Sequence, residues 1–345
     1  TAPDFTWETV TQMDFGFDAS FLNNRLTGTF DWYRRNTKDM LVAGATLPAT
    51  LGASVPKSNS ADMKTIGWEL SLGWNDRLEN GFSYWVKGVL SDYQATITKY
   101  AGNDAGFYSQ SDDDGKYYVG QKIGEIWGYH SNGLFQSDDE AATIDQSELY
   151  AGKWGAGDVK YEDLDNDGKI TKGEETIYNP GDKSIIGNKT PRYQFGITVG
   201  FDYKNFDFEM FWQGTGKRDY MLSGAQFWGF TSQWDVPYTP ALDYWTETNT
   251  DAYFPRPGWQ NGGNRVTSDR YLQSAAYGRL KNLTVGYTIP KNLTTKWGIS
   301  RLRLYVTGEN LLTITPLNDA FDPETLGGMT YPINRKVAIG LNLTL

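Results

Sequence analysis

One short acidic stretch has the residue types and the spacing of a cation-binding loop. Three aspartates occupy alternate positions, and a glycine and a glutamate follow at fixed distances: Asp163, Asp165, Asp167, Gly168 and Glu174. This order matches the twelve-residue calcium loop, in which carboxylates at positions 1, 3, 5 and 12 supply hard oxygen ligands and a glycine at position 6 makes the sharp turn. The stretch 163–174 is therefore predicted to bind Ca²⁺.

Two more positions complete the predicted ligand set. The main-chain carbonyl of Lys169 takes position 7, and Thr171 takes position 9. Helices are not evident on either side, so we expect a calcium loop without an EF-hand pair and a structural role for its ion. The alternative is a solvated acidic turn, because Asp, Asn and Gly are also common turn formers.

The sequence gives little support to catalytic chemistry. His130 is the only histidine, cysteine is absent, and no P-loop, nucleophile elbow or dinucleotide fingerprint occurs. The carboxylate pair of a glycosidase is defined by a separation in space, which spacing along the chain does not reveal. We therefore predict that the chain is not an enzyme and keep a glycosidase as an alternative.

A second group of candidate binding residues is aromatic. Trp228, Trp234, Tyr238 and Trp245 lie in one segment, interleaved with Asp and Gln and followed by Asn249. Flat rings beside such polar side chains suit stacking on sugars and recognition of hydroxyl groups. They equally suit loop packing or contact with another protein. All three interpretations stay open.

Composition limits the partners. The 345 residues include 42 acidic and 32 basic side chains, which give a formal net charge of −10. Nucleic acid is excluded as a partner, because phosphate contacts need clustered Lys and Arg. The mean hydropathy of −0.55 resembles that of a soluble protein. A membrane β-barrel, however, hides its apolar residues in alternation, which an average does not detect.

The elements that must position these residues are β-strands. Apolar and polar residues alternate along about nine segments: 13–21, 26–32, 66–74, 82–86, 191–203, 206–212, 283–289, 302–306 and 337–345. Period two is typical of strands with one apolar face. Many of these segments approach the 9–11 residues that a tilted membrane-spanning strand needs.

The connections between these segments alternate strictly between short and long. Turns at 22–25, 76–81 and 204–205 are short, whereas the long connections, which follow the second, fourth, sixth and eighth segments, have about 25, 90, 60 and 20 residues. Outer-membrane barrels have this signature, with short periplasmic turns and long outer loops. A soluble β-sandwich is the alternative, but it has no reason to place every long loop at one end. Thr1 would then lie on the outer side, so we expect a processed or partial chain.

Six stretches occur in a characteristic order: FDWYRRNTKDML from 30, GQKIGEIWGY from 120, GDVKYEDLD from 157, WTETNTDA from 245, YGRLKNLTVGY from 277 and GENL from 308. Together they resemble the C-terminal half of the SusC/RagA family of TonB-dependent outer-membrane transporters of Bacteroidetes. Each fragment alone is a weak sign of the family. Their common order and spacing are specific to it, and the fragments are distributed along most of the chain.

The resemblance implies an all-β fold and a set of partners. Residues 1–345 would form the C-terminal portion, about nine antiparallel strands, of a 22-strand transmembrane β-barrel in the outer membrane. The calcium-type loop would lie in the extracellular loop from about 95 to 190. The plug domain and upstream strands, absent from this chain, would couple to TonB. A SusD-like surface lipoprotein would form the lid, and the aromatic segment would contact that lid or the oligosaccharide or peptide cargo.

One departure and one alternative accompany this resemblance. The last residue is Leu345, whereas outer-membrane barrels usually end in an aromatic residue. The final strand nevertheless keeps the expected alternation of apolar and polar residues up to this position. The alternative function is that of a secreted, calcium-stabilised carbohydrate-binding β-protein. Dependence on detergent distinguishes the two, because only a lipid-facing barrel surface aggregates without it.

Overall fold

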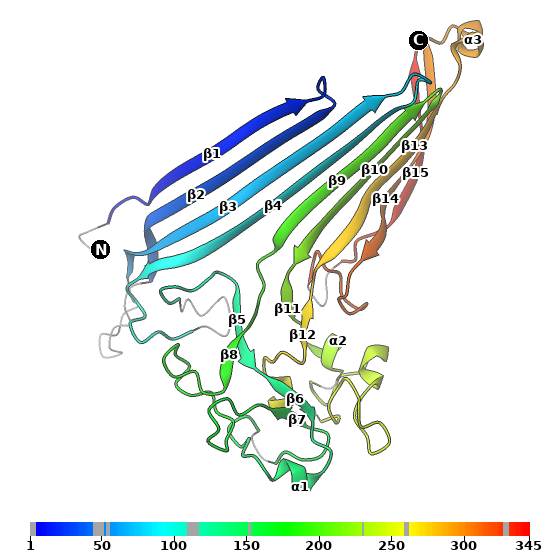
Figure 1. Cartoon of the computed structure of the whole chain (residues 1–345). Helices are drawn as coiled ribbons and strands as arrows, with labels where there is room; N and C mark the ends of the chain where they lie inside the picture. The colour runs from blue at the N-terminus through cyan, green and yellow to red at the C-terminus, as the bar shows by residue number, and fades with distance from the viewer. Residues whose placement is uncertain are drawn as a thin grey trace.

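The computed structural model describes residues 5–43, 52, 56–108, 117–150, 153–229, 231–258, 262–326 and 331–345. Its main feature is one curved antiparallel sheet with a separate body of loops at one end (Figure 1). Among these residues, no helix is both long and apolar enough to cross a membrane.

Nine strands form the sheet, in the order β1-β2-β3-β4-β9-β10-β13-β14-β15. They are β1 (Thr9–Phe21), β2 (Leu26–Ala43), β3 (Lys57–Arg77), β4 (Ser83–Tyr100), β9 (Arg192–Tyr203), β10 (Phe206–Lys217), β13 (Tyr277–Thr288), β14 (Arg301–Ile314) and β15 (Lys336–Thr344). All nine predicted strands are confirmed. The sheet is a partial barrel and is not closed, since β1 and β15 are its two edges.

The strand register sorts the side chains onto two faces. One row across six strands is apolar: Tyr84, Phe201, Phe208, Val285, Val306 and Ile339. The adjacent row, one residue along each strand, is smaller or polar apart from one indole: Trp85, Gly200, Glu209, Thr284, Thr307 and Ala338. Because successive side chains of a strand point to opposite faces, these rows belong to opposite faces of the sheet.

The apolar face is exposed in this chain, with 83% of Ile339 accessible. A single sheet with an exposed apolar face differs from the predicted alternative, a sandwich, in which two inner faces pack together. On the polar face Gly200 makes room for a large ring, because a Cβ there would lie 2.2 Å from the Trp85 side chain.

Short and long connections leave opposite ends of the sheet, as predicted (Figure 1). The short ones span 22–25, 78–82, 204–205 and 289–300, the last with α3 (Lys291–Thr294) and η5 (Thr295–Trp297). The long ones span 44–56, 101–191, 218–276 and 315–335. The first long connection is shorter than the expected 25 residues, because β2 and β3 extend to 18 and 21 residues.

The last three long connections fold together into what we call the loop body, residues 117–190, 218–276 and 315–326. Its elements are short: β5 (Glu125–Tyr129), β6 (Ser131–Leu134), α1 (Asp138–Ala141), β7 (Val159–Tyr161), β8 (Lys183–Asn188), β11 (Asp219–Met221), α2 (Ala225–Trp228), η3 (Thr239–Leu242), η4 (Gly262–Arg265) and β12 (Leu272–Ser274). Three two-stranded sheets, β5-β8, β6-β7 and β11-β12, connect distant parts of these segments.

Candidate functional site

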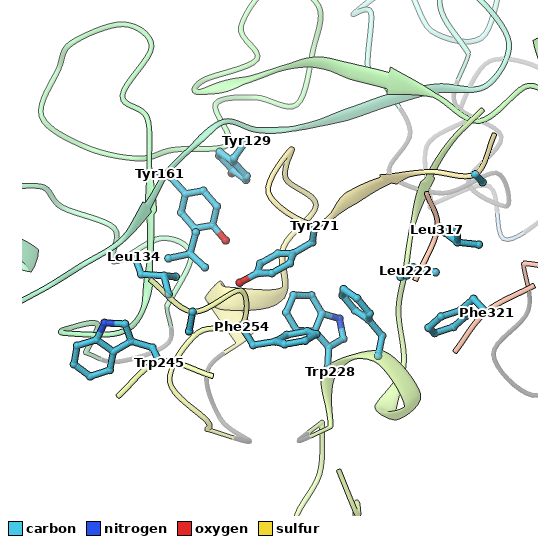
Figure 2. Packing of buried hydrophobic residues seen from close by; sticks show 14 of the residues in the cluster. Tyr129, Leu134, Tyr161, Leu222, Trp228, Trp245, Phe254, Tyr271, Leu317 and Phe321 are labelled. Carbon is cyan, nitrogen blue, oxygen red and sulfur yellow. The ribbon is translucent and has the colours of Figure 1, made fainter. Parts of the chain in front are cut away.

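The loop body has an aromatic core of its own, to which all three segments contribute. Its largest rings are Tyr129, Tyr150, Tyr161, Phe227, Trp228, Trp245, Phe254, Tyr271 and Phe321. Phe227 packs edge-on against Trp228 and Phe254, with ring centroids 5.1 Å apart in each pair. Figure 2 shows Tyr271 between Tyr161 on one side and Trp228 on the other, with Leu317 and Phe321 beyond. Rings of this size supply most of the burial that holds three loops together.

Buried hydrogen bonds join two of these segments, 117–190 and 218–276. Asp158 is fully buried, and its carboxylate accepts hydrogen bonds from Asn264 Nδ2 at 2.9 Å and from Arg256 at 3.1 Å. Asn264 Oδ1 in turn accepts the Tyr150 hydroxyl at 2.7 Å. These contacts join residues about a hundred positions apart and satisfy a buried charge, which would otherwise be costly. The loop body is therefore a packed unit and not a set of free loops.

The structure separates the four candidate aromatic residues into two pairs. Trp228 and Trp245 are buried in the aromatic core. Trp234 and Tyr238 lie between α2 and η3 and are 83% and 50% exposed, together with the exposed Val236 and Leu242. Of these four residues, only Trp234 and Tyr238 are exposed enough to contact another molecule. Sequence alone does not distinguish the pairs, because all four residues have similar neighbours.

The predicted calcium loop brings together two of its expected ligands and one residue that the motif does not contain. Oxygen atoms of Asp163, Asp165 and Asp182 all lie within 4.8 Å of one another. Asp167 and Glu174 are exposed, and neither belongs to this group of described residues. Asp182 is outside the twelve-residue window, so the motif gave no signal for it.

Backbone donors hold this group in place. Asp182 is fully buried and accepts hydrogen bonds from the N–H groups of Leu164 and Thr171, both at 2.7 Å. Asp163 accepts the N–H of Gly168 at 2.8 Å. Burial raises the pKa of Asp182, and the neighbouring carboxylates of Asp165 and Asp163 raise it further, against the lowering effect of the two N–H donors. The group is therefore short of positive charge.

The loop is also attached to the core. Ile170, next to the predicted ligands, is buried in the aromatic core. Its N–H donates to the carbonyl of Asp145 at 2.7 Å, and the Asp145 N–H donates to the carbonyl of Gly168 at 3.1 Å. An ion held here would brace the loop against the segment around residue 145.

His130 connects three strands or loops that are far apart in sequence. Its Nδ1 lies 2.8 Å from Asp269 Oδ2, and its Nε2 lies 2.7 Å from Ser184 Oγ. Because a carboxylate only accepts, Nδ1 carries the hydrogen in this pair. The other Asp269 oxygen accepts the Ser131 N–H at 3.0 Å. Serine, histidine and aspartate also form the catalytic triads of hydrolases. A hydrolase active site needs, in addition, hydrogen-bond donors that stabilise an oxyanion.

Ion pairs attach the loop body to the sheet. Arg279 of β13, which is buried, pairs with Asp322 and with Glu324 at 2.5 and 3.2 Å. Lys281 of the same strand pairs with Glu324 at 3.0 Å. Asp322 and Glu324 lie in the segment after β14, beside Phe321 of the aromatic core. We call these four charged residues the charge clamp.

Comparison with known proteins identifies relatives of this arrangement. The family model described as "TonB dependent receptor-like, beta-barrel" matches residues 1–311. TonB-dependent receptor P3 of Formosa agariphila is 30% identical over 366 residues, and TonB-dependent receptor SusC of Bacteroides thetaiotaomicron is 26% identical over 344 residues. Each alignment covers 98% of this chain.

A solved structure of the RagAB peptide transporter has the same fold, with a TM-score of 0.75 at 22% identity over 99% of this chain. The chain covers only part of each relative: 34% of P3, 32% of SusC and 36% of the RagAB chain. It therefore spans about a third of the length of the proteins that it matches.

Proposed function

Because this chain belongs to the TonB-dependent receptor-like β-barrel family of outer-membrane transporters, we propose that it forms part of the barrel of a nutrient importer. Residues 1–345 supply a continuous stretch of wall with its outer loops. Upstream strands and a plug complete the transporter, and TonB acts through that part. The cargo is an oligosaccharide or a peptide, delivered under a SusD-like lipoprotein lid.

The observation that carries this proposal is the apolar row from Tyr84 to Ile339, which continues across six strands without a charged residue. Such a face suits lipid, whereas the opposite face holds polar side chains that suit a hydrated lumen. The relatives P3 and SusC are named as receptors, and RagAB as a peptide transporter. We propose accordingly that the chain has no catalytic activity.

Import is tested in cells that lack the transporter and in cells that carry it again on a plasmid. We expect labelled oligosaccharides or peptides to enter only the second cells, and only while the membrane is energised, because TonB uses the proton-motive force. Using both cargo classes identifies the cargo. Unchanged uptake after removal of the transporter would overturn the proposal, as would recovery of the protein in a secreted, detergent-independent form.

We propose further that Trp234 and Tyr238 contact the lid. They are large, exposed aromatic residues at the loop end of the molecule, and Val236 and Leu242 beside them are also exposed. Exposed aromatic residues of this kind suit a protein contact, because Trp and Tyr are enriched among the residues that carry the binding energy of protein interfaces. The buried pair Trp228 and Trp245 would act only by supporting the loop body.

Co-purification of the lipoprotein with the transporter tests this contact. Trp234→Ala should lower the amount of bound lid about tenfold or more, as expected for an aromatic interface residue. Trp297→Ala is the matched control, because Trp297 is also exposed (64%) but lies in η5 at the other end of the strands. Equal effects of the two changes would contradict the assignment.

For the calcium-type loop we propose a structural Ca²⁺ site with Asp163, Asp165 and Asp182 as carboxylate ligands. Asp167, Lys169, Thr171 and Glu174 were expected from the motif, and the structure favours Asp182 over Glu174 for the last carboxylate. Three carboxylates with a buried member fit a divalent cation, because their oxygen atoms lie within 4.8 Å of one another and a cation between them would offset their mutual repulsion.

A further inference from the structure

A pocket of about 340 Å³ lies in the loop body, and neither the acidic group nor Trp234 lines it, although its wall residue Lys183 directly follows Asp182. Its wall comes from four parts of the chain: Tyr129 at the end of β5, residues 148–149, the stretch 172–183 before and at the start of β8, and residues 265–267 at the end of η4 and after it. The volume is enough for one sugar or amino-acid residue. Lys172 belongs to the predicted calcium loop, but none of the predicted ligands of that loop lines the pocket.

The pocket is rich in cations, although the chain as a whole is acidic. Lys172, Lys183 and Arg265 line it, against two carboxylates, Glu148 and Glu175. Glu175 is already used, since it accepts a hydrogen bond from Lys183 Nζ at 3.2 Å. Glu148 accepts the backbone N–H of Lys172 at 3.3 Å. The wall thus holds three basic side chains against two acidic ones, in a protein with a net charge of −10.

Lys183 is an unusual residue in this wall because it is only 7% exposed. Its ammonium group lies 5.4 Å from the ring centroid of Tyr129 and 5.9 Å from that of Tyr108. An anion between Lys183 and Lys172 would offset the positive charge of both ammonium groups.

One polar group in the wall has no partner within the described chain. The Tyr129 hydroxyl is buried and makes no hydrogen bond there. Ser268, which pairs with Tyr129 in a β-bridge, also has a buried hydroxyl without a hydrogen bond. Buried polar groups are nearly always hydrogen-bonded, so an orphan hydroxyl beside a pocket points to a missing ligand.

We propose that this pocket binds a ligand with a carboxylate group, the size of one sugar or amino-acid residue. The carboxylate lies among Lys172, Lys183 and Arg265, and Tyr129 donates its hydroxyl hydrogen to the ligand. Glu148 accepts a hydroxyl or N–H group from the rest of the ligand. Two sources supply this chemistry: a uronic acid at the end of an oligosaccharide, or the C-terminus of a peptide.

Calorimetric titration of the purified full-length transporter in detergent tests the site with four probes. Glucuronate and glycylglycine carry the carboxylate, whereas glucose and glycylglycine amide are their neutral counterparts. We expect at least one carboxylate probe to bind and its neutral counterpart to bind at least tenfold more weakly. Binding of glucuronate alone indicates a uronic acid, and binding of glycylglycine alone a peptide end. Binding of both shows that the carboxylate suffices.

Two variants and a control locate the binding. Lys172→Gln should weaken it about tenfold, because a hydrogen bond to a charged group is lost. Tyr129→Phe keeps the buried ring and should also weaken it, whereas a merely structural hydroxyl would leave affinity unchanged. Lys153→Gln, at an exposed position outside the pocket, should have no effect. Failure of all four probes to bind, equal binding of neutral probes, or unchanged affinity in Lys172→Gln would overturn the proposal. Import is measured separately, so these outcomes do not decide the transport proposal.

Discussion

The sheet and the loop body treat their aromatic and aliphatic residues in opposite ways. In the sheet, Phe15, Phe17, Ile339 and Leu341 are exposed on the surface of the chain. In the loop body, Phe227 and Tyr271 are buried among other rings. The sheet thus depends on an apolar surrounding outside the chain, whereas the loop body carries its own hydrophobic core. This difference shows that one chain satisfies two solvents, lipid on one region and water on the other.

The two regions also differ in how polar groups are satisfied. Sheet strands pair their backbone groups with each neighbour in regular register. The loop body relies on side chains that reach across the sequence, such as Asp158 to Asn264 and His130 to Asp269. We therefore expect a substitution in the sheet to change stability through the contact of its side chain with the surrounding medium. A substitution in the loop body should change stability through core packing and side-chain hydrogen bonds.

The largest expected effect follows from removing a ring from the core of the loop body. Phe227→Ala should lower the free energy of unfolding by about 3–5 kcal/mol, because it deletes a buried ring and leaves a cavity. Phe17→Ala, on the exposed face of β1, should cost less than half as much. Denaturant titrations of the full-length transporter, followed by tryptophan fluorescence, measure both. Equal costs would show that the loop body lacks an independent core.

A charge placed on the apolar face tests the other half of the comparison. Ile339→Arg should lower the free energy of unfolding by about 2–4 kcal/mol in phospholipid vesicles, because the guanidinium enters hydrocarbon. Ala338→Arg is the matched control, since residue 338 is adjacent on β15 and belongs to the opposite row. If both variants were equally stable, the apolar row would not face lipid.

The sequence predicts the sheet better than the loop body, and the reason is again where each region places its apolar residues. The nine strands were predictable because a face in contact with one medium forces period two on the sequence. The loop body has no such period, since its core joins rings from three connections. His130 finds its partners 54 and 139 positions away, and Asp182 lies beyond the calcium motif. Trp228 and Trp234 have similar neighbours in sequence, and only the packing of the folded loop body buries Trp228 and leaves Trp234 exposed.

Breaking the charge clamp should loosen the attachment between the two regions. The double change Asp322→Asn and Glu324→Gln leaves the buried Arg279 without a charged partner and should cost about 1–3 kcal/mol. The effect is local, so thermolysin should cleave the segment after β14 faster, while the aromatic core stays protected. Lys336→Gln is the control, because its pair with Glu309 is exposed and exposed pairs contribute little. Unchanged cleavage would show that packing of Phe321 alone holds this segment.

The smallest expected effect is that of Ca²⁺ on the loop body. At ten times its dissociation constant, an ion that binds only the folded state stabilises it by about 1.4 kcal/mol. Chelation should therefore lower the midpoint of thermal unfolding of the loop body and leave the sheet unchanged. Asp165→Asn should abolish the response, since it removes one of the three grouped carboxylates, whereas Asp139→Asn, on the exposed side of α1, should keep it. Comparison of Glu174→Gln with Asp182→Asn decides which last carboxylate the ion uses: if Glu174→Gln alone abolished the response, the motif and not the observed cluster would define the site.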